Sequence, residues 1–329
     1  MAEFDLISRI QARTGSRADV ALGLGDDAAL LLPPPGQALA VTVDTLNSGM
    51  HFPAEALPAD IGWKSLAVNL SDLAAMGAQP LWCTLSLALP RADMAWLDAF
   101  LDGFLALAGD SGIALVGGDT TQTQGPLSIS VTAMGAVPPG QALRRDGARV
   151  GDDIWVTGTP GDAFVALTLW RQGQLDVTVP NPAADLETVR QRLLRPTPRL
   201  AAGLALRGLA HACVDISDGL LGDLGHICER SAVGARLRLD AVPLPVAQRR
   251  LAVAADPYAA VLAGGDDYEL CFTAAPAQRE AIAAALLAAG TEGSRIGSIV
   301  AGSGVEVVDA LGHPWRPPHA AFQHFAADS

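Results

Sequence analysis

Residues 58–77 read PADIGWKSLAVNLSDLAAMG, and this stretch gives the first indication of the fold. Apolar residues recur at helical spacing from Ile61 to Leu73, so the stretch predicts a long helix, which Gly77 ends. Asp72 lies in the middle of this helix among apolar neighbours, where a capping role does not explain a carboxylate. The helix therefore raises the question of which positively charged group belongs beside Asp72.

Strand patterns lie on both sides of this helix, at residues 38–44 and 81–89, and strand and helix patterns alternate to the end of the chain. Residues 137–153, VPPGQALRRDGARVGDD, interrupt the alternation with proline, glycine and charge. We place a domain boundary there, between an N-terminal domain at 1–138 and a C-terminal domain at 149–329. Because strands and helices interleave in both halves, the sequence predicts an α/β (α+β) fold of two domains.

The composition is that of a globular protein, because 50% of the 329 residues are apolar and 17% are charged. The net charge of −13 argues against nucleic-acid binding through a basic surface. No apolar run reaches the roughly 18 residues that span a membrane, and the N-terminus lacks a signal pattern. Four cysteines without a C-x-x-C pair predict buried, reduced thiols. We therefore expect a cytoplasmic protein that binds neither nucleic acid nor membranes.

Aspartates recur beside glycine, serine and threonine, beginning with the stretch GLGDDAAL at residues 23–30. Flanking apolar residues suggest that this pair is partly buried. Carboxylates and hydroxyls are the ligands that Mg²⁺ prefers, and small neighbours let phosphates approach the backbone. The aspartates in such settings are Asp26, Asp27, Asp44, Asp72, Asp119, Asp215, Asp218, Asp266 and Asp267. Any one of them alone is more often structural, but five clusters together predict a site for several metal ions.

Other aspartates have a structural interpretation. Asp152 and Asp153 precede a strand just after the boundary, Asp162 fits the first turn of a helix, and Asp223 also favours a structural role. The sequence contains no G-x-x-x-x-G-K-[ST], H-E-x-x-H or G-x-S-x-G motif. A glycosidase with two carboxylates does not account for so many Gly-Asp clusters.

Six motifs in order resemble the thiamine-monophosphate kinase family: GLGDDAAL, VTVDTLNSGMHF, KSLAVNLSDLAAMGAQP, LVGGDTT, VDISDGL and GGDDYEL. The similarity covers essentially the whole chain. It implies the two-domain fold of the aminoimidazole ribonucleotide synthetase-like superfamily, with an N-terminal sheet that pairs across a homodimer. It also implies ATP-dependent phosphorylation of thiamine monophosphate to thiamine diphosphate, with several Mg²⁺ ions.

The resemblance further implies three sets of site residues. The metal ligands are Asp27, Thr42, the backbone of Val43, Asp44, Asp72, Asp119, Asp215 and Asp218. The nucleotide contacts are Gly118, Asp119, Arg145 and Ser217. The contacts to the thiamine end are His51, Asp266 and Phe322. Phe322 lacks the hydroxyl of a tyrosine, so only ring stacking is carried over, and Asp266 is shorter than the glutamate often found there.

Phosphate chemistry explains why this reaction needs metal ions. Both reactants are anions, so Mg²⁺ is needed to neutralise their repulsion and to align the γ-phosphoryl group for in-line transfer. The acceptor is a phosphate monoester with a second pKa near ~6, so it is already largely deprotonated at neutral pH. We therefore expect direct transfer without a phosphoenzyme and without a catalytic base.

Alternatives within and beyond the superfamily remain at this point. Selenophosphate synthetase would carry a reactive cysteine in a glycine-rich N-terminal segment, but the first cysteine here is Cys83. The hydrogenase-maturation relative ends in a functional cysteine, but the last one here is Cys271. A metal-stabilised module that binds nucleotide without turnover is a further alternative.

Overall fold

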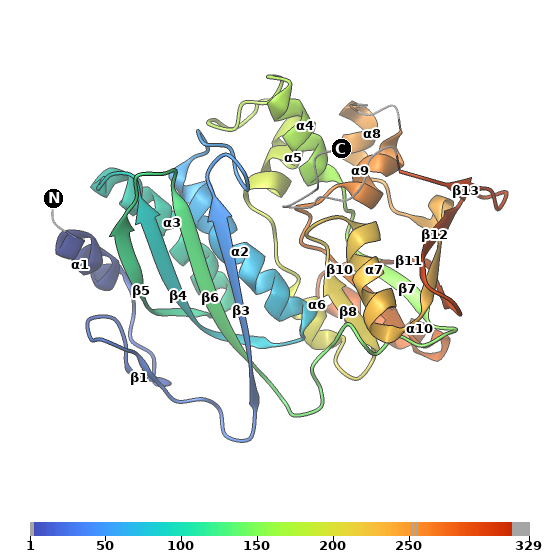
Figure 1. The fold of residues 1–329 in the computed structure, drawn as a ribbon, viewed down its shortest axis with the longest axis horizontal. Coiled ribbons are helices and arrows are strands. Elements are labelled where there is room, and N and C mark those ends of the chain that lie inside the picture. The colour runs from blue at the N-terminus through green and yellow to red at the C-terminus, as the bar shows by residue number, and fades with distance from the viewer. Residues whose placement is uncertain (1–2, 252, 254–255, 318–329) are drawn as a thin grey trace. The chain divides into compact units, whose positions relative to one another are not determined.

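The structure, a computed structural model, describes residues 3–251, 253 and 256–317 (Figure 1). The chain divides into two compact units, Met1–Leu73 with Ala78–Gly140 and Ala74–Gly77 with Gln141–Ser329. Within the described ranges, no helix combines the length and the apolar character that a bilayer crossing requires. The cysteines Cys83, Cys213, Cys228 and Cys271 are free and buried, as expected.

The first unit is built on a four-stranded sheet with the strand order β3-β6-β4-β5. The pairs β3–β6 and β6–β4 are antiparallel and β4–β5 is parallel. The elements of this unit are α1 (Glu3–Arg13), β1 (Val20–Leu22), β2 (Leu30–Leu31), β3 (Ala38–Asn47), α2 (Pro58–Ala75), β4 (Gln79–Leu89), α3 (Met94–Ser111), β5 (Ala114–Gln122) and β6 (Ser128–Val137). The predicted long helix is α2, and Gly77 follows it with a φ of 60°.

Helices α2 and α3 lie behind the sheet in Figure 1 and approach each other closely. A Cβ at Gly62 would lie 2.0 Å from the Phe100 carbonyl oxygen, and one at Gly103 would lie 1.8 Å from that of Ala59. Glycine at both positions therefore allows backbone-to-backbone packing of the two helices. This packing leaves α2 with one side available for residues of the sheet.

Strand β3 is an edge strand whose two faces differ. Leu39, Val41 and Val43 are 45%, 62% and 63% exposed. Because side chains alternate along a strand, Thr42 and Asp44 point to the other face. One face of β3 is thus apolar and uncovered in the single chain, and the other carries two of the predicted metal ligands.

Strand β3 is longer than the sequence predicts. The pattern at residues 38–44 ends at Asp44, but β3 continues to Asn47, and β5 likewise extends past Asp119 to Gln122. Pairing continues past Asp44 because hydroxyl side chains suit a strand, and the hydroxyls of Thr45 and Ser130 lie 2.7 Å apart across β3 and β6. Both aspartates are therefore held within a hydrogen-bonded ladder.

The second unit is built on a seven-stranded sheet with the order β13-β12-β9-β11-β7-β10-β8. One apolar cluster includes α7 residues such as Leu224, and another includes α10 residues such as Ile282. The strands are β7 (Asp153–Thr157), β8 (Ala212–Asp215), β9 (Gly234–Arg238), β10 (Leu270–Ala274), β11 (Gly293–Val300), β12 (Gly304–Val308) and β13 (Pro314–Trp315). The helices are α4 (Asp162–Arg171), α5 (Ala184–Leu194), α6 (Leu200–Ala205), α7 (Leu220–Ser231), α8 (Val246–Leu251), α9 (Pro257–Ala263) and α10 (Arg279–Ala288), with short 3₁₀ turns η1 (Leu239–Ala241) and η2 (Pro276–Gln278). The mixture of strands and helices in both units confirms the predicted fold class.

Candidate functional site

An acidic pair lies between β3 and α2 in the first unit. Thr42 and Asp44 share one face of β3, and the Thr42 hydroxyl donates a hydrogen bond to the Asp72 carboxylate from α2. Burial and the charge of Asp72 raise the pKa of Asp44 to about 7. The mid-helix carboxylate noticed in the sequence therefore faces a threonine and a second carboxylate.

The chemistry of this group suits a hard cation. In the described part of the chain, no hydrogen bond to the Asp44 carboxylate is found, although burial penalises its charge. Carboxylate and hydroxyl oxygens are the preferred ligands of Mg²⁺, which would relieve the repulsion between Asp44 and Asp72. The residues present therefore fit the ion that the sequence predicts.

The remaining predicted ligands of this unit do not complete a larger cluster. Among the residues that the structure describes, no group of three or more His, Cys, Asp or Glu side chains is placed to hold a metal ion. Asp27 and Asp119 thus do not join the Asp44–Asp72 pair in a three-carboxylate site. Val43 lies next to Asp44 in the edge strand, and its apolar side chain points to the opposite face. The full metal-ligand set stays a prediction.

The stretch GLGDDAAL forms an exposed turn between β1 and β2. Asp26 and Asp27 are both exposed, and Leu30 is 59% exposed. The expectation of partial burial is therefore wrong for the single chain: Gln11 of α1 donates a hydrogen bond to the Leu24 carbonyl in the turn, but both carboxylates stay exposed. The Asp26 carboxylate accepts the Asp27 N–H at 2.8 Å, so Asp26 shapes the turn while the Asp27 carboxylate faces solvent.

Gly118 and Asp119 lie side by side in β5. A Cβ at Gly118 would fall 1.8 Å from the Leu85 carbonyl oxygen, so only glycine fits this approach of β5 to β4. Asp119 is exposed and aligns with Ser86 of β4. Asp44, by contrast, aligns with Val131 of β6, which is paired with Leu85. Asp119 is therefore one cross-strand row away from Asp44.

His51 lies in the loop after β3, where its ring orientation is set by the backbone. The Asn47 N–H donates to His51 Nδ1 at 3.0 Å. Because a backbone N–H can only donate, the neutral ring carries its proton on Nε2. The ring nitrogen Nε2 is therefore the donor of His51, and its contact with the substrate stays a prediction.

In the second unit, the loop between β8 and α7 is organised by Asp223. One carboxylate oxygen of Asp223 accepts the N–H groups of Ser217, Asp218 and Gly219 at 3.1, 3.2 and 3.1 Å. Burial and the charge of Asp218 raise the pKa of Asp223 to about 7, and the three N–H groups oppose that rise. These contacts confirm the structural role that the sequence favoured for Asp223.

The same contacts define what Ser217 can offer to a ligand. Its N–H donates to Asp223, and its carbonyl accepts the N–H of Asp266 at 2.8 Å. Both backbone groups are therefore engaged, and the hydroxyl is the group that can contact a nucleotide. Asp215, at the end of β8, is buried, whereas Asp218 is half-buried beside Ser217.

Arg145 is exposed and follows Arg144, whose carbonyl accepts the N–H of Cys213 near the start of β8 at 2.9 Å. Burial raises the pKa of the Cys213 thiol, the charge of Asp215 adds to this rise, and Arg145 opposes it. Arg145 and Asp215 therefore both lie within electrostatic range of Cys213. The predicted contact Phe322 falls outside the described residues.

The segment Gly264–Tyr268 carries Asp266 on a strained backbone. Asp266 and Tyr268 have φ values of 65° and 53°, in a backbone region that residues other than glycine rarely adopt. The Tyr268 hydroxyl donates to the Asp266 carboxylate at 2.8 Å, and the Tyr268 N–H donates to the Ile216 carbonyl at 2.8 Å. The loop with Asp266 is thus bound to the loop with Ser217 by its backbone.

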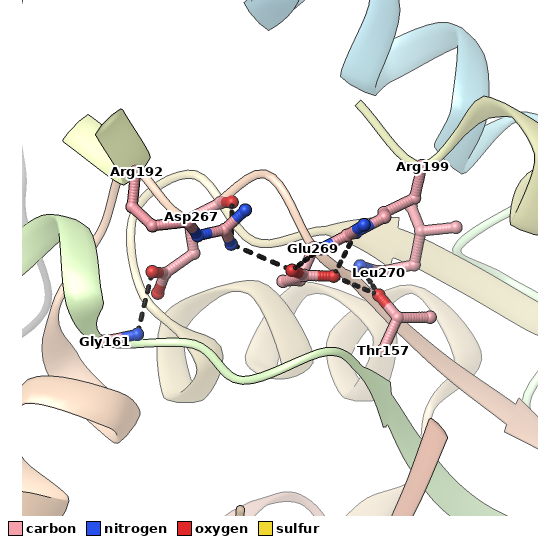
Figure 2. Close-up of polar contacts among 7 residues, drawn as sticks. All are labelled: Thr157, Gly161, Arg192, Arg199, Asp267, Glu269 and Leu270. Atoms are coloured by element: carbon pink, nitrogen blue, oxygen red, sulfur yellow. Dashed lines mark hydrogen bonds and ion pairs between the residues drawn. The ribbon is translucent and has the colours of Figure 1, made fainter. Parts of the chain in front are cut away.

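A buried ionic network follows this segment (Figure 2). Glu269 is fully buried and accepts hydrogen bonds from Arg192 of α5, Arg199 before α6 and Thr157 of β7 at 2.5–2.8 Å. Asp267 points the other way in Figure 2 and accepts the Gly161 N–H at 2.8 Å. Sequence reasoning missed Glu269 and its arginines, although the alternating acids of DDYEL were a signal that two side chains face inward.

Three aspartates for which the sequence predicts a structural role make structural contacts. Asp152 accepts the Arg149 N–H and contacts His211 Nδ1 at 2.9 Å. Asp153 binds Arg279 and Arg295. Asp162 is the first residue of α4 and is buried, and burial raises its pKa to about 6. None of these three is a candidate ligand.

Comparisons with known proteins agree with the sequence motifs. Residues 25–137 match the family "AIR synthase related protein, N-terminal domain", and residues 149–310 match the corresponding C-terminal domain. The thiamine-monophosphate kinase of Salmonella typhimurium is 47% identical over 91% of this chain and 90% of its own length.

Two solved structures support the same assignment. The crystal structure of thiamine-monophosphate kinase from Stenotrophomonas maltophilia K279a has 59% identity and a TM-score of 0.88, covering 93% of this chain and 96% of that chain. A structure described as AaThiL complexed with AMPPCP and TMP has 29% identity and a TM-score of 0.78, covering 98% of this chain and 97% of that one. The chain therefore belongs to the thiamine-monophosphate kinase family, within the AIR synthase related proteins.

Proposed function

We propose that this chain transfers the γ-phosphoryl group of ATP to thiamine monophosphate and forms thiamine diphosphate and ADP. The observation that carries this proposal is the similarity to thiamine-monophosphate kinases over nearly the whole chain. A family relative complexed with AMPPCP, an ATP analogue, and TMP supports the choice of both substrates.

The proposed Mg²⁺ ligands are divided between the two units. Asp44 and Asp72 supply two close carboxylates and Thr42 a hydroxyl, and Asp27, Asp119 and the Val43 carbonyl complete the N-terminal set. Asp215 and Asp218 are the ligands proposed from the second unit. Bound Mg²⁺ would offset the repulsion between the phosphates and stabilise the charge of the transferred group.

The nucleotide and the thiamine end have separate proposed contacts. Gly118, Asp119, Arg145 and the Ser217 hydroxyl contact the nucleotide. His51 offers its Nε2 proton and Asp266 its carboxylate to the thiamine end, and Phe322 adds a ring for stacking. We propose no catalytic base, because the acceptor phosphate is already largely ionised at neutral pH, its second pKa being about 6.

We also propose that the chain works as a homodimer, with residues 1–138 forming the dimerisation and metal-binding domain and residues 149–329 completing the site. The exposed face of β3, formed by Leu39, Val41 and Val43, supports a second copy as its cover. Light scattering at micromolar concentration should give a dimer for the native chain and a monomer for Val41→Glu. A native monomer would contradict the proposal.

The cytoplasm is the proposed location. Four buried, free thiols are compatible with a reducing compartment.

A turnover assay tests the activity. Purified protein is incubated with Mg²⁺, ATP and thiamine monophosphate, and thiamine diphosphate and ADP are quantified, with thiamine and aminoimidazole precursors in parallel and Asp44→Asn as the control. We expect thiamine diphosphate from the monophosphate alone, and its loss in the variant. Nucleotide binding without any product would overturn the proposal in favour of a binding module. ADP formation with another acceptor only would identify a relative of different specificity.

A further inference from the structure

Tyr268 stands out because its hydroxyl contacts a proposed substrate residue while its backbone is strained. It is buried, with 7% exposure, and its φ of 53° is unusual for a bulky side chain. Its hydroxyl donates to Asp266 Oδ1 at 2.8 Å. We propose that Tyr268 is a positioning residue that fixes the Asp266 carboxylate for the thiamine end of the substrate, an inference that rests on the proposed function.

The residues on either side of Tyr268 explain how the strained backbone is held. Asp267 and Glu269 are both fully buried, and their carboxylates bind different partners, while Arg192 donates both to the Asp267 carbonyl and to the Glu269 carboxylate (Figure 2). Asp267 Oδ1 accepts the N–H of Gly161, at the start of α4. Glu269 is bound by Thr157 of β7, Arg192 of α5 and Arg199, which precedes α6. Tyr268 is therefore clamped between two buried anchors, so its backbone cannot relax freely.

The Glu269 carboxylate packs closely against Gly158. A Cβ at Gly158 would lie 2.4 Å from the Glu269 carboxylate, so the carboxylate fills the space that any other residue at 158 would need. The Thr157 hydroxyl donates to Glu269 at 2.7 Å and also accepts the N–H of Leu270 at 2.8 Å. These contacts hold the side chain and the backbone of the same segment at one point.

The loop that carries Ser217 is held by hydrogen bonds that do not involve the Tyr268 hydroxyl. The proposed contacts to the nucleotide and to the thiamine end can therefore be tested separately. Asp223 holds the three N–H groups of that loop, and it does not depend on the Tyr268 hydroxyl. Removing the hydroxyl therefore removes its hydrogen bond to the Asp266 carboxylate and leaves the contacts that orient Ser217 in place. Thiamine monophosphate carries a positive thiazolium ring and an amino group, both of which a fixed carboxylate attracts. The effect should thus fall on this substrate and not on ATP.

The main test uses Tyr268→Phe, which removes one oxygen and keeps the ring. The chain offers a matched control in Tyr258→Phe, because Tyr258 is its other tyrosine and packs against the apolar core of the same unit. We expect Tyr268→Phe to raise the KM for thiamine monophosphate about fivefold to tenfold, while kcat and the KM for ATP change less than about twofold. Tyr258→Phe should leave all three unchanged.

A double-mutant cycle with Asp266→Asn separates positioning from a general loss of structure. If Tyr268 acts through Asp266, Tyr268→Phe should add little to the KM increase that Asp266→Asn causes alone. Glu269→Gln should likewise raise the KM for thiamine monophosphate more than that for ATP. Asp153→Asn, which alters another buried carboxylate bound by two arginines, should not.

Each outcome decides a different point. Equal increases in both KM values, or additive effects in the cycle, overturn the positioning role. An unchanged KM in Asp266→Asn overturns it as well, because Asp266 then makes no substrate contact. Wild-type turnover is measured first: its absence overturns the proposed function itself, whereas turnover with an unaffected Tyr268→Phe overturns only this inference.

Discussion

Asp44 in the first unit and Asp223 in the second have the same raised pKa of about 7, but different surroundings. Each is raised mainly by burial, with a second aspartate nearby, Asp72 and Asp218 respectively. Asp223 accepts three backbone N–H groups. For Asp44, no donor is found among the described residues.

The different numbers of hydrogen-bond donors indicate that Asp223 has a structural role and that Asp44 has a ligand-binding role. Asp223 is satisfied by its own chain, so its purpose is complete in the folded protein. Asp44 is half-buried beside another anion without such donors, an arrangement that costs stability and is commonly kept for function. A raised pKa alone therefore does not distinguish a structural carboxylate from a ligand-binding one, whereas the number of N–H groups that donate to the carboxylate does.

The largest expected effect is on turnover in Asp44→Asn. Removing a direct metal ligand should lower kcat by about 100-fold or more, since even indirect partners of a metal site cost 10-fold to 100-fold. The free energy of unfolding without metal should not fall, because the substitution removes like-charge repulsion with Asp72. Turnover assays and urea denaturation in EDTA measure the two quantities. Asp110→Asn, at an exposed position of α3, is the control, and full activity in Asp44→Asn would refute the ligand role.

The main effect of Asp223→Ala is expected on stability: the substitution should lower the free energy of unfolding. Three N–H groups lose their acceptor, so the free energy of unfolding should fall by about 3 kcal/mol. Asp223→Asn keeps an oxygen that can accept these groups and should lose less than about 1 kcal/mol. Urea denaturation of both variants tests the difference. Equal stability of Asp223→Ala and the wild type would remove the structural role assigned to this residue.

A smaller effect is the pH dependence of stability in the metal-free protein. The folded pKa of Asp44, about 7, exceeds its unfolded value of about 3.9, so the folded state binds more protons between these values. The contribution of Asp44 is therefore fully present below pH 4 and is lost as the pH rises through 7. In EDTA, the stability of Asp44→Asn relative to the wild type should rise over this interval. Saturating Mg²⁺ should abolish this pH dependence. A stability difference between Asp44→Asn and the wild type that does not change with pH in EDTA would contradict the account.

Local features of the sequence predicted much of the fold and the N-terminal site. The helix ending before Gly77 and the unexplained Asp72 were both visible, because helical spacing and a misplaced charge are local signals. The role of Tyr268 and Glu269 was not visible. It depends on positive φ values and on Arg192 and Arg199, which lie 77 and 70 residues from Glu269 in the chain.

Short or charged elements were also missed. Strand β9 (GARLR) has only five residues and two arginines, and it is a strand because β11 and β12 flank it. Helix α9 is seven residues long and begins at the Asp256 cap. In both cases partners distant in sequence stabilise an element whose own pattern is too short to predict it.

The smallest expected effect concerns the adjacent aspartates of the β1–β2 turn, which extend the comparison to exposed residues. Asp26 accepts the N–H of Asp27, as Asp223 does for its loop, whereas the Asp27 carboxylate faces solvent, open to a ligand. Asp26→Asn keeps an acceptor oxygen and should change kcat/KM less than about threefold, while Asp27→Asn should lower it about tenfold or more. Turnover at limiting Mg²⁺ gives the clearest contrast, because a lost ligand can be compensated by excess metal and a distorted turn cannot. If raising the Mg²⁺ concentration rescues Asp26→Asn instead of Asp27→Asn, the roles of the two carboxylates are reversed, and the number of protein donors does not identify the metal ligands of this chain.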